Sequence, residues 1–268
     1  MTEVDVPTSD GRKLHAYDTG GAGLVVMWHH GTPNIGTPPA PLFTPGVRWI
    51  AYDRPNYGGS TALPGRRIGS AAADAAVVAD ALGVDRFAVL GHSGGGPHAL
   101  ACAALLPERV TAAVSISGMA PFDAPGLDWF AGMGPMSEKT LRAAAASRAA
   151  RAAIEGGEPD FLPADWAALE GAWGWFGSVV APAVAGGPAA AIDDDMCYVT
   201  PWGFDPADVR APTLVLHGEG DLVIPATHGA WLAGRLPSAE LRVVPEAGHI
   251  SVMAAAGDAV DWLLRRAS

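Results

Sequence analysis

Cysteine is scarce in this sequence: the chain of 268 residues contains only Cys102 and Cys197. Two cysteines cannot build the disulfide framework that stabilises small secreted proteins, so we expect two free, buried thiols. The first five residues also lack the basic region and the apolar core of a secretory signal peptide. Together these absences predict a cytoplasmic protein.

Basic residues are outnumbered by acidic ones. The chain has 17 lysines and arginines against 28 aspartates and glutamates, which gives a formal net charge of -11. Nucleic acids and anionic membrane surfaces attract cationic proteins, so this balance argues against both as partners. A small-molecule substrate remains as the expected partner, and the composition leaves the oligomeric state open.

Long hydrophobic runs are also rare, and one segment needs a check. Residues 171–192 carry no charge, and a membrane-spanning helix needs about 20 apolar residues. This segment, however, contains Pro182, Pro188 and several glycines, with few large aliphatic residues. We therefore predict two short elements that cover an apolar pocket, and no interaction with a membrane.

Motifs for cofactors and metal ions are missing as well. The glycine-rich stretch 91–96 lacks the lysine of a phosphate-binding P-loop, and its glycine spacing does not fit a dinucleotide-binding fingerprint. His29 and His30 are adjacent, so on a strand they point to opposite faces, and no carboxylate lies at the spacing of a metal ligand. We expect neither a cofactor nor a metal ion.

The most informative segment that is present runs from Ala88 to Gly96. An apolar strand leads into a G-x-S-x-G pattern centred on Ser93, and an alanine-rich helix follows. A side chain at Gly91 or Gly95 would collide with so tight a turn. The turn exposes the serine hydroxyl at a helix N-terminus, where free N–H groups favour negative charge. The pattern predicts a nucleophilic serine, with a strand-to-helix turn without chemistry as the alternative.

Three further segments place polar residues directly after a predicted strand. They are His30-Gly31-Thr32-Pro33, Gly218-Glu219-Gly220-Asp221 and Ala247-Gly248-His249. With Ser93 they follow the chain order Ser–Asp–His, and the whole set resembles the α/β-hydrolase superfamily, of the serine-nucleophile type with a helical cap. Residues 49–60 add to the resemblance, with Asn56 where the family usually has glycine; asparagine also tolerates a left-handed backbone. The resemblance covers nearly the whole chain outside about residues 120–205.

The resemblance implies a role for each of these residues. Ser93 is the nucleophile, His249 the general base, and Asp221 the acid that orients the histidine. The backbone N–H groups of Thr32 and Gly94 form the oxyanion hole, which stabilises the negative charge of the transition state.

Alternatives remain open for several of these roles. Asp221 also fits a turn residue that binds its own backbone, and Asp123, just after the sixth predicted strand, is a second candidate for the acid. A lone histidine such as His249 is often structural. His30 is a loop-shaping residue in the family pattern, and we also place it among the residues near the substrate pocket.

The alternation of apolar runs and turn signals predicts an α/β fold. Residues 2–7 and 12–18 form an antiparallel pair, and the buried parallel strands are 24–29, 48–53, 87–92, 110–117, 213–218 and 241–245. The helices are 68–82, 94–106, 226–236 and 251–266. We therefore expect the α/β-hydrolase fold, a mostly parallel eight-stranded sheet with helices on both faces. Residues 1–120 and 206–268 form the core domain, and residues 121–205 form a helical cap inserted after strand six.

The cap region interrupts this alternation. Residues 137–155 predict one amphipathic helix with Arg142, Arg148 and Arg151 on its polar side. Several aromatic residues follow, among them Phe161, Trp173, Trp175 and Phe176. We predict that Trp173, Trp175 and Phe176 contribute to the substrate pocket, although packing between cap and core is the alternative. Residues 194–204 are expected to lead back to the core.

The predicted function is a serine hydrolase that cleaves small to medium carboxylic esters, lactones or similar acyl substrates through an acyl-enzyme. Haloalkane dehalogenases and epoxide hydrolases place an aspartate at the nucleophile, so Ser93 argues against both. Amino-terminal peptidases, carbon–carbon hydrolases, hydroxynitrile lyases and perhydrolases keep the serine and remain alternatives. A peptidase would need an acidic cap site for a free amine, which Glu155, Glu158, Asp160 or Asp193–Asp195 could supply. A non-catalytic ligand receptor is disfavoured, because it has no need for all three triad residues.

Overall fold

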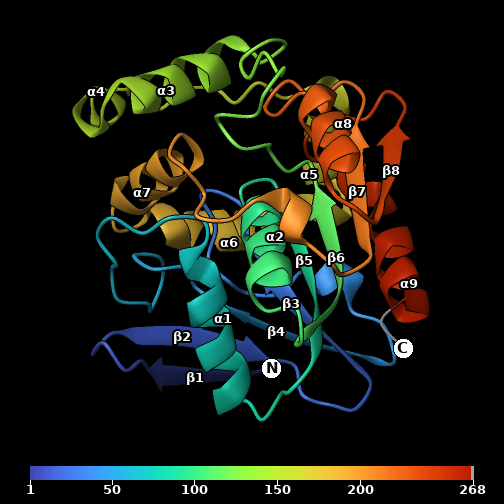
Figure 1. Ribbon diagram of the computed structural model, residues 1–268. Coiled ribbons are helices and arrows are strands. Elements are labelled where there is room, and N and C mark those ends of the chain that lie inside the picture. Colours follow the sequence, from blue (N-terminus) through green and yellow to red (C-terminus); the bar gives the residue numbers. More distant parts are fainter. Residues whose placement is uncertain (267–268) are drawn as a thin grey trace.

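The computed structural model describes residues 1–266, which form an eight-stranded sheet with helices on both faces (Figure 1). The strand order is β1-β2-β4-β3-β5-β6-β7-β8. The strands are β1 (Thr2–Pro7), β2 (Lys13–Asp18), β3 (Leu24–His29), β4 (Val47–Tyr52), β5 (Phe87–His92), β6 (Val110–Ile116), β7 (Thr213–Gly218) and β8 (Ala239–Val244). β2 pairs antiparallel with β1 and β4, and the other neighbouring pairs are parallel. The predicted α/β-hydrolase fold is confirmed.

The central strands are buried because they are covered on both sides. All six residues of β5 and of β7 are buried, as expected for short runs of apolar residues in a parallel sheet. β8 is one of the two edge strands, and its residues are half-buried or exposed. The carboxyl ends of β6 and β8 point toward the end of the molecule where the inserted helix α3 (Pro135–Ala146) lies (Figure 1).

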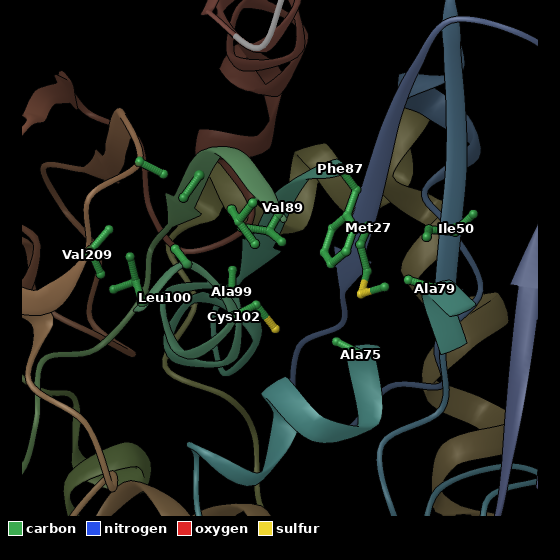
Figure 2. Close-up of a cluster of buried hydrophobic side chains, with 14 of the residues drawn as sticks. Met27, Ile50, Ala75, Ala79, Phe87, Val89, Ala99, Leu100, Cys102 and Val209 are labelled. Carbon is green, nitrogen blue, oxygen red and sulfur yellow. The ribbon is translucent and has the colours of Figure 1, made fainter. Parts of the chain in front are cut away.

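One face of the sheet is covered by α1 (Ser70–Ala81), α2 (Gly95–Leu105) and α8 (Ala226–Arg235). Alanines allow these helices to approach the sheet closely. Figure 2 shows Met27 and Phe87 of the sheet beside Ala75 and Ala79 of α1, with Cys102 of α2 nearby. These side chains belong to one buried apolar cluster that fixes α2, the helix that follows Ser93, against β5.

The opposite face packs against α9 (Ala256–Arg266), through residues such as Val260 and Leu263. The chain enters α9 through a short 3-10 helix, η4 (Ser251–Ala255), so the single helix predicted over 251–266 consists of two segments. Trp173 and Phe176 of the inserted region join the same cluster. Part of the insertion is therefore packed into the core of the sheet.

The insertion lies between β6 and β7, which agrees with a cap after the sixth strand. It contains α3 (Pro135–Ala146), α4 (Arg148–Ala152), α5 (Pro163–Glu170), η2 (Ala172–Gly174), α6 (Trp175–Val184) and α7 (Ala189–Tyr198). The domain boundaries at 120/121 and 205/206 stay predictions. Residues 194–198, expected to lead back to the core, form the last part of α7.

The prediction of one helix over 137–155 was wrong, because the helix breaks at Ser147. Ser147 has an extended backbone with φ -177°, and its hydroxyl accepts a hydrogen bond from Ala150 N at 3.0 Å, which caps α4. The break turns α4 so that Arg148 and Arg151 reach the acidic residues of α7. These arginines therefore form ion pairs rather than only a solvated face.

Within residues 1–266, no single helix is long and apolar enough to cross a membrane. The segments Ala172–Val184 and Ala189–Tyr198 together satisfy the length and composition criteria, but they meet at an angle of 105°. The break falls at the glycines and Pro188 that argued against a span in the sequence. Buried residues on both segments, including Phe176 and Asp194, face the protein interior.

Candidate active site

Ser93 lies on the sharp turn between β5 and α2. Its φ is +55°, a left-handed conformation that non-glycine residues rarely adopt. A methyl group at Gly91 would collide with the backbone of Gly95, and one at Gly95 would collide with the carbonyl of His29. The Ser93 N–H donates to Ile116 O of the adjacent strand at 2.8 Å. This strained turn is therefore held by the sheet on one side and by the helix on the other.

The structure brings Ser93, His249 and Asp221 into one chain of hydrogen bonds. The Ser93 hydroxyl lies 2.8 Å from His249 Nε2, and His249 Nδ1 lies 2.8 Å from Asp221 Oδ2. The three residues follow β5, β7 and β8, so the parallel sheet collects them at its carboxyl end. The exposed fraction is 9% for Ser93, 4% for His249 and 3% for Asp221. Such an arrangement can transfer a proton from the serine to the histidine.

Asp221 is fixed on both of its carboxylate oxygens. Oδ1 accepts the backbone N–H groups of Val223 and Ile224, each at 2.9 Å, while Oδ2 accepts from His249. Burial alone would raise the pKa of Asp221, but the charge of His249 and these hydrogen bonds hold the pKa below its ordinary value. The group therefore stays ionised. Asp123, the second candidate for the acid, is exposed.

Thr32 and Gly94, the predicted oxyanion-hole residues, lie side by side. A Cβ atom placed on Gly94 would lie 2.8 Å from Thr32 Oγ1 and would collide with the Tyr198 hydroxyl of α7. Gly31 is adjacent to Ser93, since its added Cβ would lie 3.5 Å from Ser93 Cβ. The loop after β3 and the start of α2 therefore meet at the serine, as a backbone oxyanion hole requires.

His30 does not offer a polar group to a pocket. Its side chain is 1% exposed, Nδ1 donates to Gly31 O at 2.8 Å, and Nε2 accepts from the Arg54 N–H at 3.0 Å. Burial and the charge of Arg54 hold the pKa of His30 well below its ordinary value, so the ring stays neutral. The assignment of His30 to the substrate pocket is therefore corrected, because both ring nitrogens are engaged in shaping the loop.

The predicted pocket aromatics occupy different surroundings. Trp173 and Phe176 are buried in the core cluster, whereas Trp175 is half-buried beside Trp28, with ring centroids 6.3 Å apart. The Phe176 ring centroid lies 5.4 Å from that of His92, the residue that precedes Ser93. A further aromatic residue, Phe161, lies beside His249. Their ring centroids are 6.5 Å apart and the rings are stacked, with an interplanar angle of 20°.

A buried ionic cluster was not predicted. It lies next to the loop after β3 that carries Thr32, called the oxyanion loop below. Asp194 of α7 is fully buried and forms ion pairs of 2.6 Å with both Arg54 and Arg66. Burial would raise the pKa of Asp194, but the two guanidinium groups hold it well below its usual range. Its hydrogen bonds also reach Thr32 Oγ1, at 2.5 Å, and the Tyr57 hydroxyl, at 2.9 Å. The only signal in the sequence was an acidic triplet, 193–195, after a long uncharged run.

A second buried aspartate of the insertion, Asp165 of α5, was also missed. Its carboxylate accepts hydrogen bonds from the backbone of His249 and from the two residues that follow. In the sequence it resembles an ordinary acidic residue in the first turn of a helix. Among residues 1–266, no group of three or more histidine, cysteine, aspartate or glutamate side chains is placed to hold a metal ion.

Asp195 leads to a prediction about pH and stability. Burial raises its pKa to about 6, despite the ion pair with Arg151. The folded protein therefore binds this proton more tightly than the unfolded chain, and this stabilisation is present below about pH 4 and lost as the pH rises to about 6. Asp195→Asn should gain stability relative to the parent protein across this window, on the order of 3 kcal/mol.

Denaturant unfolding of both proteins at several pH values measures this difference. The free energy of unfolding should diverge between about pH 4 and 6 and run parallel above it. A constant difference across that range would show that Asp195 keeps the same affinity for its proton in both states.

Comparisons with known proteins agree with the fold. A family model described as the alpha/beta hydrolase fold matches residues 19–256. The chain is 26% identical over 261 residues to 2-hydroxy-6-oxo-6-phenylhexa-2,4-dienoate hydrolase of Burkholderia cepacia, across 88% of this chain and 85% of that protein. A thermophilic esterase from Thermogutta terrifontis is similar in structure, with a TM-score of 0.71, 21% identity, and coverage of 100% of this chain and 99% of that one. The enol-lactonase of Burkholderia xenovorans LB400 has a TM-score of 0.71, 20% identity, and coverage of 98% of both chains.

Proposed function

Because the chain belongs to the α/β-hydrolase fold family, we propose that it is a serine hydrolase of small to medium carboxylic esters, lactones or similar acyl substrates. The observation that carries this proposal is the continuous hydrogen-bonded chain from Ser93 through His249 to Asp221. A buried serine in strained geometry with a histidine at hydrogen-bonding distance has the features of an activated nucleophile.

The proposed mechanism follows from these contacts. His249 Nε2 takes the hydroxyl proton of Ser93 as the serine oxygen attacks the substrate carbonyl, and Asp221 stabilises the imidazolium that forms. The N–H groups of Thr32 and Gly94 bind the oxyanion. The protonated histidine then donates to the leaving alcohol, and a water molecule activated by the same histidine releases the acyl group.

Charge around the site favours an uncharged acyl group over a substrate with a free amine. A peptidase of amino termini needs an available carboxylate in the cap, and Asp193, Asp194 and Asp195 are each paired with an arginine. Asp160 caps α3 by accepting the N–H groups of Met136 and Ser137, and the other two candidate carboxylates, Glu155 and Glu158, are exposed to solvent. The aromatic rings of Phe161 and Phe176 instead offer apolar surface near the reacting groups.

We expect Phe161 and Phe176 to set the preference for acyl chain length. Replacing either by alanine should raise KM for p-nitrophenyl octanoate more than for p-nitrophenyl acetate, because only the longer chain reaches the lost surface. Phe122→Ala is the control, since Phe122 also belongs to the inserted region but packs against Trp129 and Phe130, with ring centroids 5.2 and 5.8 Å away. Steady-state kinetics with a series of ester lengths, alongside thermal unfolding, measures both effects.

Packing alone predicts a different outcome. If Phe161→Ala and Phe176→Ala both show the same chain-length profile as the parent protein and a lowered melting temperature, these two rings only stabilise the fold. The pocket would then be lined by other residues.

Reaction of the protein with a fluorophosphonate tests the proposal as a whole. Such a reagent should label Ser93 and should block turnover of p-nitrophenyl esters. Peptide mass spectrometry locates the labelled residue. Turnover of esters supports the proposal, and labelling confined to another residue contradicts it.

Carbon–carbon bond hydrolysis is the second candidate, favoured by the similarity to the Burkholderia cepacia enzyme over most of the chain. That reaction uses a serine triad as well, so the site geometry does not separate the two. Including 2-hydroxy-6-oxo-6-phenylhexa-2,4-dienoate in the substrate panel does. Rapid cleavage of this compound with no turnover of esters would favour the second candidate.

A further inference from the structure

Asp165 forms an unusually complete set of contacts with the loop that carries His249. The side chain is 1% exposed and comes from α5 in the insertion. Oδ1 accepts from Ile250 N at 2.9 Å, from Ser251 N at 2.7 Å and from Ser251 Oγ at 2.8 Å. Oδ2 accepts from Leu162 N at 2.9 Å and from the N–H of His249 itself at 3.3 Å.

These contacts replace a helix cap that the local sequence lacks. The N–H groups at the start of η4 need acceptors, and Ile250 at the cap position has no side-chain acceptor. A carboxylate about 85 residues earlier in the chain supplies them instead. The loop passes so close to Asp165 that a methyl group on Gly248 would collide with the carboxylate. The backbone of His249 is therefore positioned by the insertion.

Asp194 makes the corresponding contact with the oxyanion loop. It accepts the hydroxyl proton of Thr32, and the Tyr198 hydroxyl lies 2.6 Å from the same Thr32 oxygen. Arg54, paired with Asp194, donates to Gly31 O at 2.9 Å and also to His30 O. The loop that bears the Thr32 N–H is thus held between α7 and the buried arginine.

We propose that Asp165 and Asp194 are positioning residues for catalysis, so that the inserted helices hold the general base and the oxyanion hole in place in addition to covering the site. This inference rests on the proposed function, because it assigns the two aspartates to the same Ser93 site. Neither aspartate touches the substrate. Each acts through a loop whose displacement by about 1 Å is enough to cost on the order of 10²-fold in rate.

Another carboxylate of the insertion, Asp160, caps a helix without contacting a loop of the proposed active site. Asp160 also accepts backbone N–H groups, but its two donors, Met136 and Ser137, belong to α3 within the insertion. Asp160→Asn therefore removes a comparable capping contact without touching a catalytic loop. This makes it a matched control for Asp165→Asn, which replaces one accepting oxygen by an NH₂ group facing N–H donors.

The test compares kcat and KM of the full chain on p-nitrophenyl acetate, with thermal unfolding of each variant. Asp165→Asn should lower kcat by about 10²-fold with KM changed less than about threefold, since ground-state binding is retained. Thr32→Val, which removes the hydroxyl held by Asp194 but keeps the backbone N–H, should lower kcat about tenfold in the same manner. Asp160→Asn should leave both constants within about twofold, whatever its melting temperature.

Gly248→Ala provides a second route to the Asp165 contact if Asp165→Asn does not fold. Its methyl group would displace the carboxylate and should reproduce the loss of kcat; in the double variant the two losses should not add. Unchanged kcat in folded Asp165→Asn or Gly248→Ala, with active parent protein, overturns the inference while the proposed function stands. A parent protein that turns over no ester overturns the proposed function first, and the two failures are thereby distinguished.

Discussion

Replacing Ser93 by alanine should lower ester hydrolysis by about 10⁴-fold or more while the protein stays folded. The hydroxyl is the group that His249 Nε2 contacts at 2.8 Å, and alanine removes only that oxygen. The remaining oxyanion donors and the binding surface account for residual activity above the rate in water. Initial rates on p-nitrophenyl acetate at matched protein concentration measure the loss, and circular dichroism with thermal unfolding establishes that the fold is retained.

Ser117 offers a matched control for this experiment. It follows the neighbouring strand β6, is buried, and has a left-handed backbone with φ +47°, much as Ser93 has after β5. Its hydroxyl has no hydrogen-bond partner within residues 1–266. Ser117→Ala should therefore leave turnover nearly unchanged. Equal activity losses in the two variants, or normal turnover by Ser93→Ala, would show that Ser93 is not the nucleophile.

The strands were the most predictable part of the fold. The observed bounds of β3, β5 and β7 coincide with the predicted runs 24–29, 87–92 and 213–218. Each is a mostly apolar run that ends at a glycine or histidine, because burial on both faces of a parallel sheet favours apolar side chains. The edge strand β8, covered less completely, begins two residues before the predicted 241–245.

The proposed catalytic residues could be predicted because their positions depend on the strands, which were themselves predictable. Ser93 directly follows β5, Asp221 and His249 lie in the loops that follow β7 and β8, and the parallel sheet brings these strand ends together. Local patterns were therefore sufficient to select residues that lie far apart in the chain. Asn56 illustrates this on a smaller scale: the left-handed backbone that the sequence suggested is present, with φ +78°.

The insertion was less predictable because its contacts are long-range. Asp165 and Asp194 bind loops about 85 and 160 residues away, and no local pattern distinguishes them from solvated helix acids. Nor does the alanine-rich stretch 137–155 show where it breaks, because Ser147 is tolerated within a helix and becomes a cap only once α4 packs against α7. The burial of His30 also depends on a contact from elsewhere in the chain: the backbone N–H of Arg54, which follows β4, donates to His30 Nε2.

Asp221→Asn should lower kcat on esters by about 10³- to 10⁴-fold. Asparagine keeps the shape of the side chain, but its NH₂ group facing His249 Nδ1 would favour the tautomer that carries its proton on Nε2. In that tautomer Nε2 cannot accept the proton of Ser93, and no negative charge stabilises the imidazolium of the transition state. Single-turnover and steady-state rates on p-nitrophenyl acetate should fall together, with little change in KM.

Asp123→Asn tests the other position at which an α/β hydrolase can carry its acid. Asp123 is exposed beyond β6, whereas Asp221 Oδ2 lies 2.8 Å from His249 Nδ1, so we expect at most a small change in rate for the Asp123 variant. The comparison also separates catalysis from stability. Asp221 binds the N–H groups of Val223 and Ile224 as well, and the asparagine of the Asp221→Asn variant retains one oxygen that can still accept them. A large loss of rate with a modest loss of melting temperature in Asp221→Asn therefore assigns the acid to Asp221, and the opposite ranking of the two variants would assign it to Asp123.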